Sequence, residues 1–299
     1  RDRRRAPRLS SAALLSGVAP LLDAQKLLAD LTEPQRQAVT HVDGPLLIVA
    51  GAGSGKTRVI TRRVAYLMSQ GIPGSTILAI TFTNKAAGEM KSRVGQLLGR
   101  ELRDFGKLDQ PWPLICTFHS LGLRILRHYA AKVGLPAAFS VYDTADQERV
   151  VKDAVKAADL STENFPPSMV LGQISNAKNR LQLAKDFAAS VHDFAGRNIA
   201  RIYAQYEKLL KKNHAVDFDD LLMRTVLGFR DHADMLAEVQ SRFQYILIDE
   251  FQDTNHAQYM MAHLLALKHR NICVVGDPDQ CLPRGTRVQT ARGARRIES

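Results

Sequence analysis

A glycine-rich loop between an apolar run and a Lys-Thr pair is the feature that most restricts how this chain can fold. Residues 46–57 read Leu-Leu-Ile-Val-Ala-Gly-Ala-Gly-Ser-Gly-Lys-Thr, and helical spacing follows over residues 58–70. Glycine tolerates backbone conformations that other residues avoid, so the loop can curl until successive N–H groups point inward at an anion. The dipole of the following helix favours the same anion. The order strand, glycine-rich loop and helix therefore predicts a cradle for the phosphates of a nucleoside triphosphate.

Individual residues of this loop have distinct expected roles. Lys56 places a positive charge beside the outer phosphates, and the hydroxyl of Thr57 is suited to Mg²⁺ at the start of the helix. The strict pattern has glycine at position 50, where this chain has Ala50, which is small enough to leave the loop buildable. An ordinary glycine-rich turn is the alternative, but it would not need the flanking strand and helix. The residues expected around the nucleotide are Ala50, Gly51, Ala52, Gly53, Ser54, Gly55, Lys56 and Thr57.

The charge of the chain is concentrated at its two ends. The formal net charge is +11, of which residues 1–8 and residues 281–299 carry +4 each. The 272 residues between them therefore hold only +3. The overall charge thus says little about binding partners. Residues 1–22 are expected to form a disordered basic leader, not a secretory signal, because Gly17 and Pro20 interrupt their apolar run. The three cysteines lack metal-ligand spacing, and no segment reaches the length of a membrane span. We therefore expect a cytoplasmic protein.

Strand-like apolar runs alternate with helical stretches along most of the chain. This alternation predicts an α/β fold in which helices cover both faces of a parallel sheet. The interval between the third and fourth runs is too long for one crossover connection. Helical apolar spacing fills it, so residues 125–214 are predicted to form an inserted helical subdomain. The five predicted strands are Leu46–Ala50, Ile77–Thr81, Leu114–Thr117, Tyr245–Ile248 and Ile272–Val275.

A second motif follows the fourth strand, where Asp249 and Glu250 begin the sequence Asp-Glu-Phe-Gln-Asp. Acidic residues at the carboxyl end of a parallel strand lie at the edge where such sheets bind ligands. Asp249 can hold Mg²⁺ directly or through water, and Glu250 can take a proton from an attacking water. An acidic surface turn is the weaker alternative. We expect the phosphate loop and this carboxylate pair on neighbouring strands of one sheet, which together indicate hydrolysis as well as binding.

These residues resemble the motifs of the UvrD/PcrA/Rep group of superfamily 1 DNA helicases. The sequence Asp-Glu-Phe-Gln-Asp-Thr-Asn at 249–255 is similar to motif II of the group, which usually has Tyr where this chain has Phe251. The other motifs occur in the family's order across about residues 31–280. They are Leu31–Gln35 (the Q motif), Ala50–Thr57 followed by Arg58 (motif I), Ile80–Met90 (Ia), Thr117–Ser120 (Ib) and Val274–Gln280 (the first half of III).

The resemblance implies a RecA-like ATP-binding domain over residues 23–124 and 215–280, with ATP and Mg²⁺ as cofactors. It implies 3′-to-5′ movement on single-stranded DNA, with duplex DNA as a further partner, in repair or replication restart. Gln35 would read the adenine edge, Arg58 would join the nucleotide site, and Gln280 would sense the γ-phosphate and couple its loss to DNA. Domains 2A and 2B, which carry motifs IV to VI in the family, are missing from this sequence. We therefore expect this chain alone to bind ATP weakly and to hydrolyse it negligibly.

The DNA contacts are assigned by the same resemblance. Phe82 is the candidate for base stacking, with Thr83, Asn84 and His119 near the DNA backbone. Phe82 could instead be a core residue that continues its strand, and His119 could be a satisfied buried histidine. An alternative for the whole chain is a DNA-dependent phosphate-loop ATPase that acts as a switch without unwinding.

The likeness to the helicase group stops at Cys281. Where the group continues Ser-Ile-Tyr-Arg, this chain reads Cys-Leu-Pro-Arg-Gly-Thr-Arg-Val, which resembles the opening block of an intein. The Cys281 thiol could attack the Gln280 carbonyl and convert the amide to a thioester. Residues 281–299 are therefore predicted to start an intein whose remainder is absent, which makes the chain a splicing precursor that is inactive as a helicase until spliced. A divergent helicase tail and a split intein with a short first piece are the alternatives.

Overall fold

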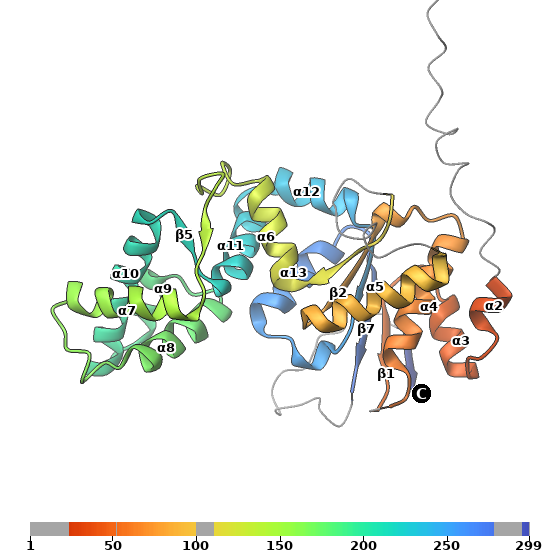
Figure 1. Cartoon of the computed structure of the whole chain (residues 1–299), viewed down its shortest axis with the longest axis horizontal. Helices are drawn as coiled ribbons and strands as arrows, with labels where there is room; N and C mark the ends of the chain where they lie inside the picture. Colours follow the sequence, from red (N-terminus) through yellow and green to blue (C-terminus); the bar gives the residue numbers. More distant parts are fainter. Residues whose placement is uncertain (1–23, 52, 100–110, 278–294, 299) are drawn as a thin grey trace, which may run out of the picture.

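The computed structural model describes residues 24–51, 53–99, 111–277 and 295–298. Within these residues, six strands form a central sheet in which every neighbouring pair runs parallel (Figure 1). The order across the sheet is β3-β2-β6-β7-β1-β8. The five predicted strands are confirmed to within one residue at each end. Their bounds, with that of the sixth strand, are β1 Leu46–Val49, β2 Ile77–Thr81, β3 Leu114–Thr117, β6 Tyr245–Ile248, β7 Asn271–Gly276 and β8 Arg295–Glu298.

The strand before the phosphate loop and the strand before the carboxylate pair are not neighbours, so this expectation was wrong. β7 pairs with β1 on one side and with β6 on the other, and so separates them. The register places Ile48 beside Val275 and Ile248 beside Val274. One intervening strand moves two others apart by about 4.8 Å more than direct pairing would. The long side chains of the site must therefore reach across the edge of β7.

Helices cover both faces of the sheet, as predicted. Alternate residues of β2 enter two separate cores, with Ile77 and Ala79 on one side and Leu78 and Ile80 on the other. Burial on both faces explains why this strand is a continuous apolar run. The first core is covered by α2 (Ala24–Leu28), α3 (Glu33–Thr40), α4 (Lys56–Ser69) and α5 (Asn84–Leu98). The second is covered by α6 (Phe118–His128), α11 (Phe218–Asp231), α12 (Ala233–Arg242) and α13 (His256–Ala266).

A group of helices extends to one side of the sheet domain (Figure 1). It packs around a third core that includes Val151, Ile174 and Tyr203. These helices lie in the stretch for which the sequence predicts an inserted subdomain, although the predicted start at residue 125 falls inside α6. The members of this helical group are α7 (Thr144–Ala157), α8 (Pro167–Asn179), α9 (Ala184–Ser190) and α10 (Phe194–Lys212), with the short parallel strands β4 (Ser140–Val141) and β5 (Ala215–Val216) at its base.

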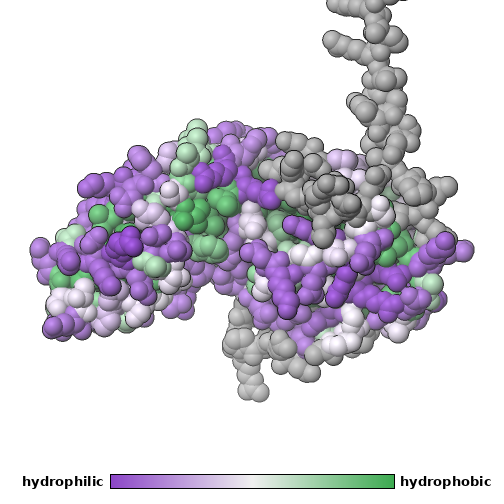
Figure 2. Space-filling model, in the orientation of Figure 1, coloured by the Kyte–Doolittle hydropathy of each residue, from purple (hydrophilic) through white to green (hydrophobic). Residues whose placement is uncertain are grey.

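None of the described helices has both the length and the apolar composition that crossing a bilayer requires. The face shown in Figure 2 is mostly hydrophilic, with an apolar patch between the helical group and the sheet domain. Large exposed apolar side chains are scattered over several elements, namely Met169, Phe194, Phe218 and Leu267.

Candidate functional site

The glycine-rich loop connects β1 to α4 at the carboxyl edge of the sheet. Gly53 and Gly55 have φ angles of +77° and +87°, in the left-handed region that favours glycine. The carbonyl of Gly51 accepts from both the N–H and the hydroxyl of Ser54, at 3.3 and 2.7 Å. Gly55 caps α4 without a side-chain hydrogen bond, which leaves the N–H groups of the first turn suited to an anion. Ala50 is buried, which explains why a small residue suits that position.

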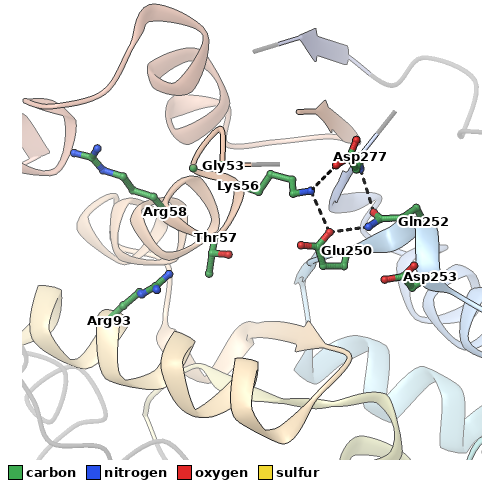
Figure 3. Close-up of a pocket in the computed structure, with 10 residues that line it drawn as sticks. Gly53, Lys56, Thr57, Arg58, Arg93, Glu250, Gln252, Asp253 and Asp277 are labelled. Carbon is green, nitrogen blue, oxygen red and sulfur yellow. Dashed lines mark hydrogen bonds and ion pairs between the residues drawn. The ribbon is translucent and has the colours of Figure 1, made fainter. Parts of the chain in front are cut away.

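Lys56 is only 9% exposed, and two carboxylates share its ammonium group. Its Nζ atom lies 3.2 Å from Glu250 Oε2 and 3.5 Å from Asp277 Oδ2 (Figure 3). A buried cation needs compensating negative charge, so these two acids hold Lys56 in place. Phosphate oxygens supply the same charge, so an incoming triphosphate can take over as the partner of Lys56.

Gln252 ties the two partners of Lys56 together. Its side-chain amide donates to Glu250 Oε2 at 2.7 Å and accepts from the backbone N–H of Asp277 at 3.1 Å (Figure 3). Glu250 has a φ angle of +49°, a conformation that is strained for a residue with a Cβ atom. Gln252 was not predicted from the sequence, although its position two residues after the candidate general base was a usable signal.

Asp249 and Thr57 meet despite the strand between them. The hydroxyl of Thr57 donates to Asp249 Oδ2 at 3.4 Å. Burial raises the pKa of the Asp249 carboxyl above its ordinary value, and the neighbouring charge of Glu250 raises it further. A divalent cation would act in the opposite direction, because it favours the ionised carboxylate.

The chemistry of this pair fits Mg²⁺. Among the described residues, no group of three or more His, Cys, Asp or Glu side chains is placed to hold a metal ion alone. Mg²⁺ in nucleotide sites uses one or two protein ligands and completes its shell with phosphate oxygens and water. Thr57 and Asp249, beside the phosphate loop, are the residues that would hold it.

A pocket of about 570 Å³ is lined by most of the side chains described so far, namely Lys56, Thr57, Glu250, Gln252 and Asp277, together with Gly53 and Gly55 of the loop. Arg58 and Arg93 lie on the side of it away from Glu250 (Figure 3). Arg58 pairs with Asp30 at 3.0 Å, and Arg93 pairs with Glu89 at 3.5 Å. Arg93 was not predicted from the sequence, because a basic residue on a helix carries no local signal of the pocket it faces. Asp253 also lines the pocket and was likewise not predicted.

Gln35 lies against the phosphate loop from α3. Its Nε2 donates to the carbonyl of Ser54 at 2.9 Å, and its Oε1 accepts from the N–H of Thr32 at 3.2 Å. The second contact belongs to the capping box that begins α3. The structure places Gln35 at the loop, whereas its reading of an adenine edge stays a prediction.

Phe82 follows directly after β2 and is half-buried. Its ring meets that of Phe118 edge to face, with 5.9 Å between the centroids, and packs against the second core. The hydroxyl of Thr83 accepts from the N–H of Ala86 at 3.1 Å and so caps α5, while Asn84 is exposed. Part of Phe82 therefore belongs to the core and part remains accessible.

His119 lies in the first turn of α6, away from the nucleotide pocket. Its ring lies 4.9 Å from that of Phe218, which begins α11 and is 51% exposed. Burial lowers the pKa of His119 below its ordinary value. Phe218 was not predicted from the sequence, although a single aromatic residue inside the acidic run 217–220 was a signal for it.

Several sequence-based assignments fall outside the described residues. These are the leader 1–22, Ala52 of the phosphate loop, the coupling residue Gln280 and the thiol of Cys281. Of the predicted intein segment, the structure describes only β8, which pairs with β1 and places Ile297 in the first core.

The profile of the UvrD/REP helicase N-terminal domain matches residues 31–284. The chain is 45% identical over 257 residues to the ATP-dependent DNA helicase PcrA of Staphylococcus epidermidis, which covers 86% of this chain and 34% of that protein. It is 46% identical over 262 residues to the ATP-dependent DNA helicase PcrA of Bacillus subtilis, and this match covers 87% of this chain and 34% of that protein. The chain thus spans about a third of the length of these relatives.

Proposed function

The chain belongs to the UvrD/REP helicase family, and on this premise we propose that it is the ATP-binding, DNA-contacting part of a 3′-to-5′ DNA helicase. The ion pairs of Lys56 with Glu250 and Asp277, beside the Thr57–Asp249 contact, are the observation that supports the proposal most. Residues 23–124 and 215–280 act as the ATP-binding domain 1A, and residues 125–214 as the inserted domain 1B. The protein works in the cytoplasm, in repair or replication restart.

Nucleotide binding begins with an exchange of partners at Lys56. The triphosphate enters beside the loop N–H groups, and its outer phosphates replace Glu250 and Asp277 at the ammonium group. The exchange conserves charge around a buried cation, so it avoids the cost of leaving Lys56 uncompensated. Arg58 and Gln35, at the rim of the same loop, contact the remainder of the nucleotide.

Glu250 becomes available as a general base only after this exchange. While its carboxylate is paired with Lys56 at 3.2 Å, it is not free to orient a water. Gln252 still holds Glu250 at 2.7 Å and fixes its direction, so the freed carboxylate can orient a water and take its proton. When bound at Thr57 and Asp249, Mg²⁺ supplies neutralisation of the charge on the phosphate oxygens.

DNA is bound on the face that carries Phe82 and His119. Phe82 offers the accessible part of its ring to a base, and Asn84 offers an exposed amide to the backbone. His119 contributes a neutral imidazole. Domains 2A and 2B of the family would provide the opposite wall, so we expect residues 1–299 without them to bind ATP weakly and to hydrolyse it negligibly.

The test uses the chain as it stands and then a longer product. A fluorescent ATP analogue is titrated with and without Mg²⁺, and ATP turnover is measured with and without single-stranded DNA. We expect Mg²⁺-dependent binding and negligible turnover, and DNA-stimulated turnover by this chain alone would overturn the second expectation. No binding in the millimolar range would overturn the whole proposal. A strand-displacement assay on a product that includes motifs IV to VI separates unwinding from a DNA-dependent ATPase switch.

The sequence Gln280-Cys281 supports a second candidate function, the start of protein splicing at this junction. We propose that Cys281 attacks the Gln280 carbonyl to form a thioester, which is the first step of intein chemistry. Added thiol would then cleave the chain after residue 280. Mass spectrometry that finds only intact chain, with a Cys281→Ala variant as the control, would count against the intein.

A further inference from the structure

Two hydrogen bonds connect the nucleotide-binding segment to the helical group. Asn255 donates from Nδ2 to Asn179 Oδ1 at 2.6 Å, and Asn179 donates from Nδ2 to Asp219 Oδ1 at 3.1 Å. Asn255 caps α13, Asn179 ends α8, and Asp219 lies in the first turn of α11. We call these three residues the amide relay.

The direction of each hydrogen bond in the amide relay is fixed by its neighbours. An ionised Asp219 only accepts, so the Nδ2 of Asn179 faces it and the Oδ1 is left for Asn255. The Oδ1 of Asn255 is already engaged, because it accepts from the N–H of Gln258 at 2.9 Å as the cap of α13. The Nδ2 of Asn255 is therefore the atom that reaches α8.

The pocket end of the relay is short. One 3-10 turn, η3 (Phe251–Asp253), lies between Glu250 and Asn255. Hydrogen bonds close this turn, one to the carbonyl of Glu250 at 3.0 Å and one from the hydroxyl of Thr254 at 2.6 Å. A phosphate that displaces Glu250 from Lys56 therefore acts on a short, hydrogen-bonded segment that leads directly to the start of α13.

The other end of the relay is anchored by a buried ion cluster. The ammonium group of Lys178, the residue before Asn179, lies 2.7 Å from Asp217, 3.0 Å from Asp220 and 2.7 Å from Glu207. Lys178 and the two aspartates are almost completely buried. These contacts bind the end of α8 to the start of α11, so the two helices respond as one body.

We infer that the amide relay positions the segment after β6 against the helical group and transmits nucleotide occupancy at Lys56 to α8. This inference rests on the proposed function, because it requires a phosphate that displaces Glu250. Asn179 and Asp219 are positioning residues, since neither lines the nucleotide pocket. Coupling through a shared element is reciprocal, so the state of α8 also affects nucleotide affinity.

Hydrogen exchange of the α8 amides, with and without a saturating Mg²⁺–ATP analogue, tests the inference. In the wild-type chain we expect the nucleotide to change exchange in the last turn of α8 by about fivefold or more. The variant Asn255→Asp keeps an equally good helix cap but loses the donor and opposes two oxygen atoms. We expect it to bind the nucleotide without the response in α8.

A double variant restores the relay with reversed polarity. In Asn255→Asp combined with Asp219→Asn, the side chain of Asn179 can turn over, accept from position 219 and donate to position 255, while it gives up its hydrogen bond of 2.9 Å to the Ser175 carbonyl. We expect the α8 response to return. The single variant Asp219→Asn is the matched control, because its amide oxygen still accepts from Asn179 and the response should persist.

The outcomes are distinguishable from those of the proposed function. A wild-type chain that binds no nucleotide in the same titration defeats the proposed function and this inference with it. Binding without a response in α8, or a response that survives in Asn255→Asp, overturns the inference alone, as does a folded double variant that stays unresponsive. Should Asn255→Asp fail to fold, Asn179→Ala removes the same contact and leaves the α13 cap in place, and persistence of the response there overturns the inference.

Discussion

The hydroxyl of Thr57 donates to Asp249 Oδ2 at 3.4 Å, although β7 lies between the strands that lead to the two residues. The contact is made beyond the carboxyl ends of the strands, because Thr57 lies in the first turn of α4 and Asp249 directly follows β6. A site of this kind is assembled by loops at one edge and does not require adjacent strands. Mg²⁺ held there would face the phosphates and the carboxylate at once.

Replacing Lys56 by alanine should weaken binding of the ATP analogue by about tenfold or more, the worth of a charged hydrogen bond of about 1.5–3 kcal/mol. The loss is compounded because Glu250 and Asp277 then face the phosphates without an intervening cation. Fluorescence titration measures the change. Lys85→Ala, at an exposed lysine of α5, is the control and should bind as the wild type does. Equal affinities of wild type and Lys56→Ala for the ATP analogue would rule out a role of Lys56 in phosphate binding.

Phe82→Ala should weaken binding of single-stranded DNA by about 1–3 kcal/mol, the usual contribution of one base stacked on an aromatic ring. Anisotropy with a labelled oligonucleotide at low salt measures the affinity. Phe194→Ala, at an exposed ring of α10 outside the proposed DNA face, is the matched control. Undiminished binding by Phe82→Ala would leave Phe82 as a core residue only.

Lys178→Met should lower the free energy of unfolding by about 3–5 kcal/mol, because it leaves buried carboxylates without their cation. Burial alone would lower the pKa of Lys178, but Asp217, Asp220 and Glu207 outweigh it and raise the pKa well above its ordinary value. The carboxylate cluster therefore favours the charged form of Lys178. Denaturant unfolding measures the loss, with Lys152→Met on the exposed face of α7 as the control. A change below about 0.5 kcal/mol would contradict the ion cluster.

The folded state should lose stability through His119 as the pH falls below 6.5. Burial lowers the pKa of His119 from 6.5, so the unfolded chain takes up this proton more readily than the folded chain does. The stability that depends on a neutral His119 is fully present above the pKa of this group in the unfolded chain. It is lost as the pH falls toward the lower pKa of the group in the folded chain. Between pH 7.5 and 5.5, the free energy of unfolding should therefore change less with pH for His119→Asn than for wild type, as denaturant unfolding at each pH would measure. His256→Asn, at an exposed histidine, is the comparison, and an equal effect there would contradict the assignment.

Two glycine-to-alanine substitutions should change the stability of the chain in opposite directions. A Cβ atom on Gly122 of α6 would lie 2.4 Å from the carbonyl oxygen of Leu221, so Gly122→Ala must push α6 and α11 apart. We expect a loss of about 1–3 kcal/mol, as for other overpacked cores. Gly88 of α5 has open space around it, so Gly88→Ala should stabilise the chain by about 0.5–1 kcal/mol through helix propensity alone. Thermal unfolding compares the two, and a stabilised Gly122→Ala variant would show that the helices are not in close contact.

The sequence predicted the strands, the fold class and the family well, because each depends on local pattern. A strand buried on both faces, such as β2, is a continuous apolar run whatever its neighbours are. The order of strands is a different matter, since no local pattern in β1 or β6 records that β7 separates them. Motif order carried the family assignment, which the profile match over residues 31–284 confirmed.

Residues that act through partners distant in the sequence were the ones missed. Lys178 looks like any helical lysine, and its three carboxylates come from residues 29 to 42 positions later in the chain. Nothing in the sequence around Gln252 indicates that its side chain contacts the backbone of Asp277, which the fold brings beside it. Such contacts depend on tertiary structure, and they become visible only when the elements are placed together.

The short pairing of β4 with β5 has a consequence for the history of this fold. Ser140 pairs with Ala215 and Val141 with Val216, so the chain leaves toward the helical group and returns at adjacent points. An excursion with adjacent ends can lengthen, shorten or be exchanged without moving the sheet beneath it. The β4–β5 pairing thus marks where the chain enters and leaves the helical group, while the contacts of α8 with α11 and α13 hold that group against the sheet domain.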